Sequence, residues 1–344
     1  MFDALLKRFG AFRRDTHPGG VRPVDMPRSE AVLTASDAEQ PWMDLQALMA
    51  IESLELRVQR LVQGICRGQH RSARRGYSAE FSEYRPYSPG DDLRHLDWRR
   101  LARTDRPYLR QYEEESDWGC LVLLDLSGSM GYGSLSHTKA DYARTLAGTL
   151  GVYLHNQGDP VGLLRLSKDS GDAIPIGRSS KQLSRWWSLL AADPAGRDSS
   201  LAQAFETVPV LLKRPGLVVV ISDFLSAPQA WAAPLKQLRA ARHEVVFFEV
   251  LDPHELEFPF DGDTQFQDLE TSRQLDVDAS RARTDYLERF NAHRKRVADE
   301  CEEQSVLFIP AHTHTPLEPI LRQAISGIGR RGARSSTGQG GAAS

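Results

Sequence analysis

From residue 119 onward, short apolar runs alternate with longer segments in which apolar residues recur every three or four positions. The short runs predict strands buried on both faces, and the longer periodic segments predict helices. Their alternation predicts an α/β fold, in which helices cover both faces of a doubly wound, mainly parallel sheet. The predicted strands are Cys120–Leu124, Val161–Leu166, Leu217–Ile221, Val245–Val250 and Val306–Ile309, and the predicted helices lie near 138–156, 180–191, 200–212, 228–241, 280–304 and 316–326.

Composition divides the rest of the chain. The first residues are rich in Pro, Gly, Asp and Ser without a period, and the last are of low complexity, so both ends predict disorder. Asp44–Val62 predicts one or two amphipathic helices, and Thr264–Glu270 with Arg273–Val277 predicts an inserted β-hairpin. The predicted division is a leader (1–42), a helical and Arg-rich segment (43–117), the α/β domain (118–326) and a tail (327–344).

Polar oxygen-bearing side chains follow the first predicted strand of this domain. Asp125, Ser127 and Ser129 stand at alternate positions directly after the apolar run, among turn-forming glycines. In an open α/β sheet, ligands bind at the carboxyl ends of the strands. One carboxylate and two hydroxyls are hard oxygen donors of the kind that Mg²⁺ binds, although Asp and Ser here could also form an ordinary turn or helix cap. The pattern resembles the metal-ion-dependent adhesion site of von Willebrand factor A domains.

Two further candidate ligands lie downstream. Asp223 follows the apolar run that begins at Leu217, and in a doubly wound sheet this strand can neighbour the one that ends near Asp125. In von Willebrand factor A domains a threonine ligand begins another helix, and Ser199 stands at the corresponding place, with Asp198 and Ser200 as alternatives. Serine lacks the methyl group that stiffens the threonine side chain. We therefore expect Mg²⁺ or Mn²⁺ to bind weakly to Asp125, Ser127, Ser129, Ser199 and Asp223.

Bulk composition narrows the functional classes. The chain has 344 residues, a formal net charge of −3 and three cysteines far apart in sequence. The near-neutral charge gives no general attraction to nucleic acid or anionic lipid, and the cysteine spacing argues against a disulfide scaffold or zinc ribbon. No apolar stretch is long enough to predict a transmembrane helix, so we expect a cytoplasmic protein without an integral membrane segment.

An Arg-rich block precedes the α/β domain and carries a family resemblance. It contains Arg75-Gly-Tyr-Ser-Ala-Glu-Phe81, Arg85-Pro-Tyr-Ser-Pro-Gly-Asp-Asp-Leu-Arg94 and Leu96-Asp-Trp98. These motifs, with Gly158-Asp-Pro-Val-Gly162 and Asp252-Pro-His-Glu255 downstream, resemble the bacterial family called domain of unknown function 58 over residues 50 to 325. Members are von Willebrand factor A-like and are usually encoded near MoxR-type AAA+ ATPases.

The Arg-rich block allows three interpretations. Between Arg57 and Arg110 there are 13 arginines and no lysine, against six acidic residues. Arginine pairs with carboxylates in bidentate fashion, so an internal ion-pair network that braces the block against the domain is the first interpretation. A contact surface for a protein partner is the second. Binding of nucleic acid is the third, and the interleaved carboxylates disfavour it.

The sequence supports two classes of function. The resemblance implies a non-enzymatic, metal-dependent protein-interaction module, which works with a MoxR-like AAA+ ATPase in maturation or remodelling of a client protein complex. The alternative is a phosphotransferase or hydrolase that uses Asp125 and Ser127. The chain has no phosphate-binding loop, no H-E-x-x-H motif and no G-x-S-x-G elbow, so the enzyme class lacks a recognisable motif.

Overall fold

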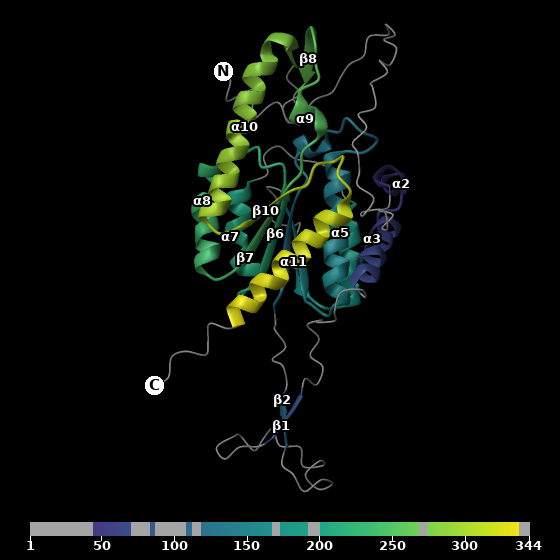
Figure 1. The fold of residues 1–344 in the computed structure, drawn as a ribbon, viewed down its shortest axis with the longest axis vertical. Helices are drawn as coiled ribbons and strands as arrows, with labels where there is room; N and C mark the ends of the chain where they lie inside the picture. Colours follow the sequence, from purple (N-terminus) through teal and green to yellow (C-terminus); the bar gives the residue numbers. More distant parts are fainter. Residues whose placement is uncertain are drawn as a thin grey trace, which may run out of the picture.

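The computed structural model describes residues 44–69, 83–86, 108–111, 118–166, 173–191, 200–267 and 274–336. Its centre is a six-stranded sheet with the order β10-β7-β6-β3-β4-β5 (Figure 1). All neighbouring strands run parallel except β4 and β5, so the predicted doubly wound, mainly parallel sheet is confirmed. The strands are β3 (Cys120–Asp125), β4 (Val161–Leu166), β5 (Ala173–Gly177), β6 (Leu217–Ser222), β7 (Glu244–Glu249) and β10 (Leu307–Pro310).

Helices cover both faces of the sheet, as the alternating pattern predicts. Alternate residues of β3 enter two separate cores: Val122 packs in one core, and Leu121 packs in the other. Both side chains are fully buried, which explains why the strand is apolar at every position. The first core involves α5 (Lys139–Asn156), α6 (Ser180–Leu190) and α11 (Leu317–Ser336), and the second involves α7 (Leu201–Leu211), α8 (Ala232–Ala240) and α10 (Ala279–Glu303).

Three boundaries differ from prediction. The pattern misses β5, an edge strand of five residues, because its central residue is a proline, Pro175, which is exposed and argues against a strand. The predicted helix near 228–241 is a 3-10 turn, Pro228–Ala230, followed by α8. The last helix does not end near 326, because α11 continues to Ser336. A Cβ atom at Gly327 would lie 2.6 Å from the Leu307 side chain, so this glycine permits the close approach of α11 to β10. Residues 337–344 and the predicted leader lie outside the described residues.

The N-terminal helices are α2 (Leu45–Met49) and α3 (Leu54–Gln69), and both contribute to the first core. Arg57 joins them to α5, since its guanidinium donates to the Ile51 carbonyl oxygen at 2.8 Å and to Thr145 Oγ1 at 3.0 Å. The predicted boundary between 117 and 118 therefore does not separate these helices from the α/β domain. An amphipathic helix buries its apolar face on a neighbour, and here the neighbour is α5.

The Arg-rich block is described only in part. Within it, β1 (Glu83–Pro86) and β2 (Tyr108–Gln111) pair as an antiparallel ribbon, which stands apart from the main sheet in Figure 1. Most other residues of the block, including Trp98, lie outside the described residues. Whether the block is a brace or a partner surface stays a prediction.

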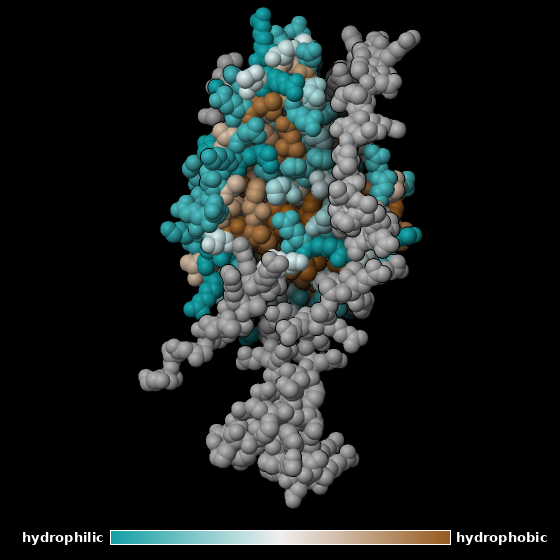
Figure 2. All heavy atoms as spheres, in the orientation of Figure 1, coloured by the Kyte–Doolittle hydropathy of each residue, from teal (hydrophilic) through white to brown (hydrophobic). Residues whose placement is uncertain are grey.

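A third, aromatic cluster lies beyond the carboxyl end of the sheet. It joins α9 (Pro253–Glu257), the hairpin of β8 (Asp263–Gln267) and β9 (Gln274–Asp278), and the first half of α10, around Phe258, Phe266, Tyr286 and Phe290. The predicted inserted hairpin is thus confirmed. Hydrophilic residues predominate on the face drawn in Figure 2, and apolar residues show between them. Among the described helices, none combines the length and hydropathy needed to span a membrane.

The docking of α3 gives a direct test of the shared core. Ile65 of α3 is fully buried, whereas Leu56 of the same helix is 56% exposed. We expect Ile65→Ala to lower the free energy of unfolding by about 2–5 kcal/mol. The matched control, Leu56→Ala, should change it by no more than about 0.5 kcal/mol. Urea unfolding of the full chain measures both, and equal small effects would contradict a common core.

Candidate metal centre

The candidate residues lie where the winding of the sheet reverses. Counted along the chain and read from the β5 edge, the strands stand in the order 3-2-1-4-5-6, because β3 is first and β6 is fourth. The crossovers run in opposite directions from β3 and from β6, so the carboxyl ends of these two neighbours form the switch point at which open α/β sheets bind ligands. Asp125 is the last residue of β3, and Asp223 directly follows β6. The sheet therefore brings the two predicted aspartates to one edge.

Both oxygens of Asp125 are held by neighbouring donors. The backbone N–H of Ser127 donates to Oδ1 at 2.9 Å, and the Ser222 hydroxyl donates to Oδ2 at 2.7 Å. Burial and the nearby charge of Asp223 raise the pKa of Asp125, although these hydrogen bonds oppose the shift. Two buried carboxylates in close proximity attract a cation, because a positive charge between them offsets both their repulsion and their loss of hydration.

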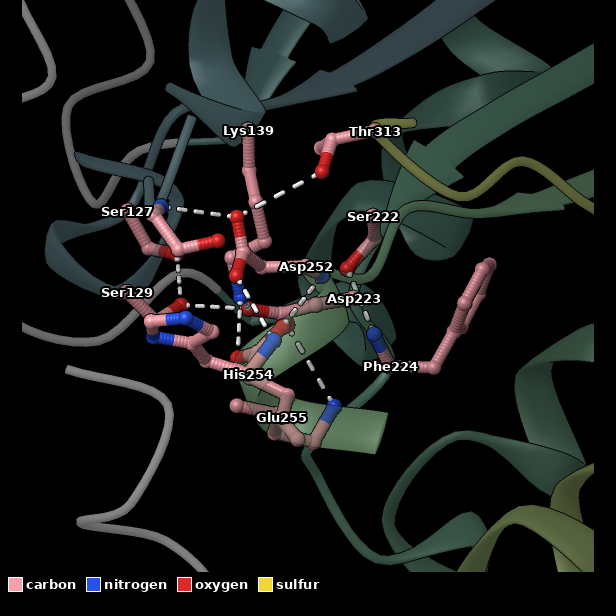
Figure 3. A network of polar contacts seen from close by, with 12 residues as sticks. Ser127, Ser129, Lys139, Ser222, Asp223, Phe224, Asp252, His254, Glu255 and Thr313 are labelled. Atoms are coloured by element: carbon pink, nitrogen blue, oxygen red, sulfur yellow. Dashed lines mark hydrogen bonds and ion pairs between the residues drawn. The ribbon is translucent and has the colours of Figure 1, made fainter. Parts of the chain in front are cut away.

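A chain of hydroxyls connects the predicted ligands (Figure 3). Ser127 Oγ lies 3.0 Å from Ser129 Oγ, and Ser129 donates to Asp223 Oδ2 at 2.7 Å. Two adjacent ligands of an octahedral Mg²⁺ ion, each at roughly 2.1 Å from the metal, are about 3.0 Å apart. The spacing of the two hydroxyl oxygens therefore fits neighbouring corners of a magnesium coordination shell.

The turn after Asp223 is fixed by an unusual backbone conformation. Phe224 has a φ of 50°, which a residue with a side chain rarely adopts. Its N–H donates to Ser222 Oγ at 3.1 Å, and its carbonyl oxygen accepts a hydrogen bond from His293 Nε2 at 2.8 Å. Its ring stacks on Phe247 with a centroid separation of 4.5 Å. These contacts hold the strained turn and with it the direction of the Asp223 side chain.

A buried lysine lies against the same carboxylate. Lys139 Nζ is 2.9 Å from Asp223 Oδ2 and 2.7 Å from Glu255 Oε1, and its side chain is fully buried. Burial disfavours the charged ammonium, but the two carboxylates outweigh burial and raise the pKa of Lys139. Burial, offset only in part by Lys139, raises the pKa of Glu255 to about 7. The Lys139 ammonium thus forms ion pairs with two carboxylates, those of Asp223 and Glu255, and the Asp125 carboxylate lies near them.

A further carboxylate, that of Asp252, connects the surrounding loops through hydrogen bonds. Asp252 accepts hydrogen bonds from the N–H of Ser134 at 2.9 Å, the N–H of His254 at 2.9 Å and the hydroxyl of Thr313 at 3.4 Å. Its own N–H donates to Glu255 Oε2 at 2.8 Å, which completes a capping box at the start of α9. The loops that follow β3, β7 and β10 are therefore joined around the candidate centre.

The structure describes four of the five predicted metal ligands. It brings Asp125, Ser127, Ser129 and Asp223 together, each no more than 7% exposed. Ser199 and its alternative Asp198 lie outside the described residues, and Ser200 caps α7 by accepting from the N–H of Gln203. Within the described ranges, no three His, Cys, Asp or Glu side chains are grouped so that they could hold a metal ion. Hydroxyl oxygens would have to complete the shell.

Sequence reasoning missed Lys139 and Glu255 and the anchor Ser222. A signal existed for Lys139, which is the first residue of α5, because a cation is disfavoured at a helix amino terminus. Asp252 and Glu255 have the spacing of a capping box, and that pattern is readable without a structure. Nothing in the sequence indicated that the two features meet, because Lys139 and Glu255 are 116 residues apart.

The raised pKa of Glu255 predicts a pH dependence. A carboxyl whose folded pKa, about 7, exceeds its unfolded value of 4.5 stabilises the fold below the unfolded value and loses that contribution as the pH rises through the folded value. Glutamine cannot ionise. In chelator, we expect the difference in unfolding free energy between Glu255→Gln and wild type to shift in favour of the variant by up to about 3 kcal/mol from about pH 5 to about pH 8. This shift adds to a pH-independent loss from the broken ion pair with Lys139.

Glu257→Gln, a substitution of an exposed residue on the same helix, is the matched control for exchange of a carboxylate for an amide. Denaturant unfolding across this pH range measures the difference for each variant. A difference for Glu255→Gln that does not change with pH would show that burial does not disfavour the ionised Glu255 carboxylate.

The chain is similar to several proteins without an assigned function. An uncharacterized protein of Mycobacterium tuberculosis is 33% identical over 261 residues, which cover 74% of this chain and 81% of that protein. An uncharacterized protein of Mycobacterium avium is 43% identical over 107 residues, which cover 30% of this chain and 62% of that protein.

Two solved structures are similar at lower identity. An aerotolerance-related membrane protein from Bacteroides fragilis has a TM-score of 0.44 and 17% identity, and the similarity covers 62% of this chain and 99% of that one. The conserved hypothetical protein BatB from Bacteroides thetaiotaomicron has a TM-score of 0.35 and 15% identity, covering 55% and 98%. These scores are too low to carry an argument about function.

The family model described as "Protein of unknown function DUF58" matches residues 83–296, which is more than half of the chain. The match includes β3, β6 and α9, the elements that supply the candidate centre. It confirms the resemblance inferred from the Arg-rich and downstream motifs. The chain belongs to the DUF58 family.

Proposed function

We propose that this chain is a non-enzymatic, metal-dependent protein-interaction module. Mg²⁺ or Mn²⁺ would be held by Asp125, Ser127, Ser129 and Asp223, with Ser199 as a further candidate ligand. The observation that carries the proposal is the 3.0 Å spacing of the two serine hydroxyls, in a chain of oxygens that ends on Asp223 at the switch point of the sheet. Serine and aspartate oxygens suit a hard divalent cation.

The small number of protein ligands would leave coordination positions on the ion open. Mg²⁺ takes about six oxygen ligands and usually keeps several waters. Ser127 and Ser129 supply neutral oxygens, so within this set the negative charge comes from the two aspartates, one of which is already paired with Lys139. An ion held in this way has positions left for ligands from outside, and an aspartate or glutamate of another protein is the chemically matched occupant. Binding of the partner would then depend on the ion.

The partner is inferred from the family resemblance. DUF58 motifs imply a MoxR-like AAA+ ATPase as the functional companion, and the two proteins together would act in maturation or remodelling of a client complex. An ATPase supplies mechanical work but needs a contact to its client or adaptor. A carboxylate-binding centre on a rigid sheet provides such a contact, because the loops around it are joined by the Asp252 and Glu255 hydrogen bonds.

An enzymatic role for Asp125 and Ser127 is less well supported by the geometry. Both oxygens of Asp125 already accept hydrogen bonds, and Ser127 lies in the hydroxyl chain that leads to Asp223. These contacts orient the oxygens as fixed ligands. A serine nucleophile requires a neighbouring base that removes its proton, and the hydrogen bonds of the described residues place no histidine beside Ser127.

Capture of the purified MoxR-like AAA+ ATPase of the same organism tests the function. Wild type, immobilised as the full chain, should retain the ATPase in Mg²⁺ and release it in chelator. Asp125→Asn should lose at least about tenfold in affinity, since it removes a charge from the centre. Asp159→Asn is the matched control, because Asp159 precedes β4 and lies at the opposite end of the sheet. Equal retention by all three proteins in chelator would refute metal-dependent recruitment.

A further inference from the structure

Lys139 occupies a position that is unfavourable for a charged ammonium group. It is the first residue of α5, where the positive end of the helix dipole repels a cation. It is also fully buried, and an unpaired buried ammonium is very unfavourable. The two ion pairs with Asp223 and Glu255 compensate for both effects. The ammonium is therefore fixed beside the candidate metal centre.

Asp223 is the residue that Lys139 and a metal ion would share. Its Oδ2 atom accepts hydrogen bonds from Ser129 Oγ at 2.7 Å and from Lys139 Nζ at 2.9 Å. Among the described residues, its Oδ1 atom accepts a hydrogen bond from the N–H of Leu225 at 3.4 Å. An oxygen that accepts two hydrogen bonds, one of them from an ammonium, is a poor donor to a metal ion, because its lone pairs and its charge are already engaged.

Glu255 anchors the competing cation. It accepts from Lys139 Nζ at 2.7 Å and from the N–H of Asp252 at 2.8 Å, and the hydroxyl of Tyr286 donates to its carbonyl oxygen at 3.0 Å. These contacts fix α9 and keep the ammonium near Asp223. A divalent ion that enters the centre consequently meets a permanent positive charge next to one of its two carboxylates.

We propose that Lys139 is an internal competitor of the metal ion, which shares Asp223 with the ion and keeps the affinity of the isolated protein for a free cation low. This inference rests on the proposed function. The inference also explains why metal binding would depend on a partner. A carboxylate from the partner supplies the negative charge that Lys139 withdraws. Lys139 acts through Asp223 and is a positioning residue for the metal centre.

The test distinguishes the effect of the Lys139–Asp223 contact on metal affinity from the effect of the net charge of the centre. Lys139→Met alone removes a positive charge and leaves Asp223 and Glu255 without their buried partner, so it carries a risk of misfolding. At a pH above the pKa of Glu255, the double variant Lys139→Met/Glu255→Gln removes one positive and one negative charge, and the net charge of the centre equals that of wild type. The two proteins differ in whether an ammonium engages Asp223.

Titration with Mn²⁺, followed by the electron paramagnetic resonance of the free ion, measures the affinity of each full-length variant. We expect the double variant to bind Mn²⁺ at least about tenfold more tightly than wild type, and the gain to disappear when Asp125→Asn is added. Its melting temperature should also rise more on addition of Mn²⁺ than that of wild type, because tighter binding stabilises the folded state more strongly.

Two results would overturn the inference, and they are distinguishable. If wild type binds Mn²⁺ in an Asp125-dependent manner and the double variant binds within about twofold of it, Lys139 does not compete and the proposed metal centre stands. If neither protein binds Mn²⁺ while both fold cooperatively, the metal centre itself is refuted and the role of Lys139 fails with it.

Discussion

The candidate centre depends on an imbalance of buried charge. The carboxylates of Asp125, Asp223 and Glu255 lie at the switch point of the sheet, and Lys139 is the ammonium that contacts two of them. Buried carboxylates without sufficient compensation bind protons or cations, which is why the pKa values of Asp125 and Glu255 are raised. A divalent cation relieves the same imbalance. The electrostatics therefore support the proposed metal-dependent role.

The fold provides this arrangement through rigid elements. The strands β3 and β6 are neighbours, and every residue of both is buried. The left-handed turn at Phe224 and the Asp252 hydrogen bonds fix the loops that carry the charged groups. The fixed backbone and side chains cannot rearrange to screen the excess negative charge. A site of this kind therefore retains its electrostatic attraction for a cation.

The sequence predicts the central sheet well because its parallel strands are mainly apolar, although Arg165 interrupts β4. It predicts Asp125, Ser127, Ser129 and Asp223 because they directly follow apolar runs. Lys139 and Glu255 were missed, since an ion pair between residues 116 positions apart has no local pattern. The edge strand β5 and the end of α11 were missed for a different reason: the pairing of β5 with β4 and the close packing at Gly327 are set by tertiary contacts.

The most direct measurement is the anomalous scattering of a crystal of the full chain grown with Mn²⁺. We expect one strong peak at the carboxyl end of β3 and β6, within coordination distance of Ser127 Oγ and Ser129 Oγ, roughly 2.0–2.3 Å. Lys139 should remain paired with Glu255 in that crystal. An ordered structure with Mn²⁺ at other sites, or with these two hydroxyls still hydrogen-bonded to each other and no peak beside them, would contradict a metal centre at this position.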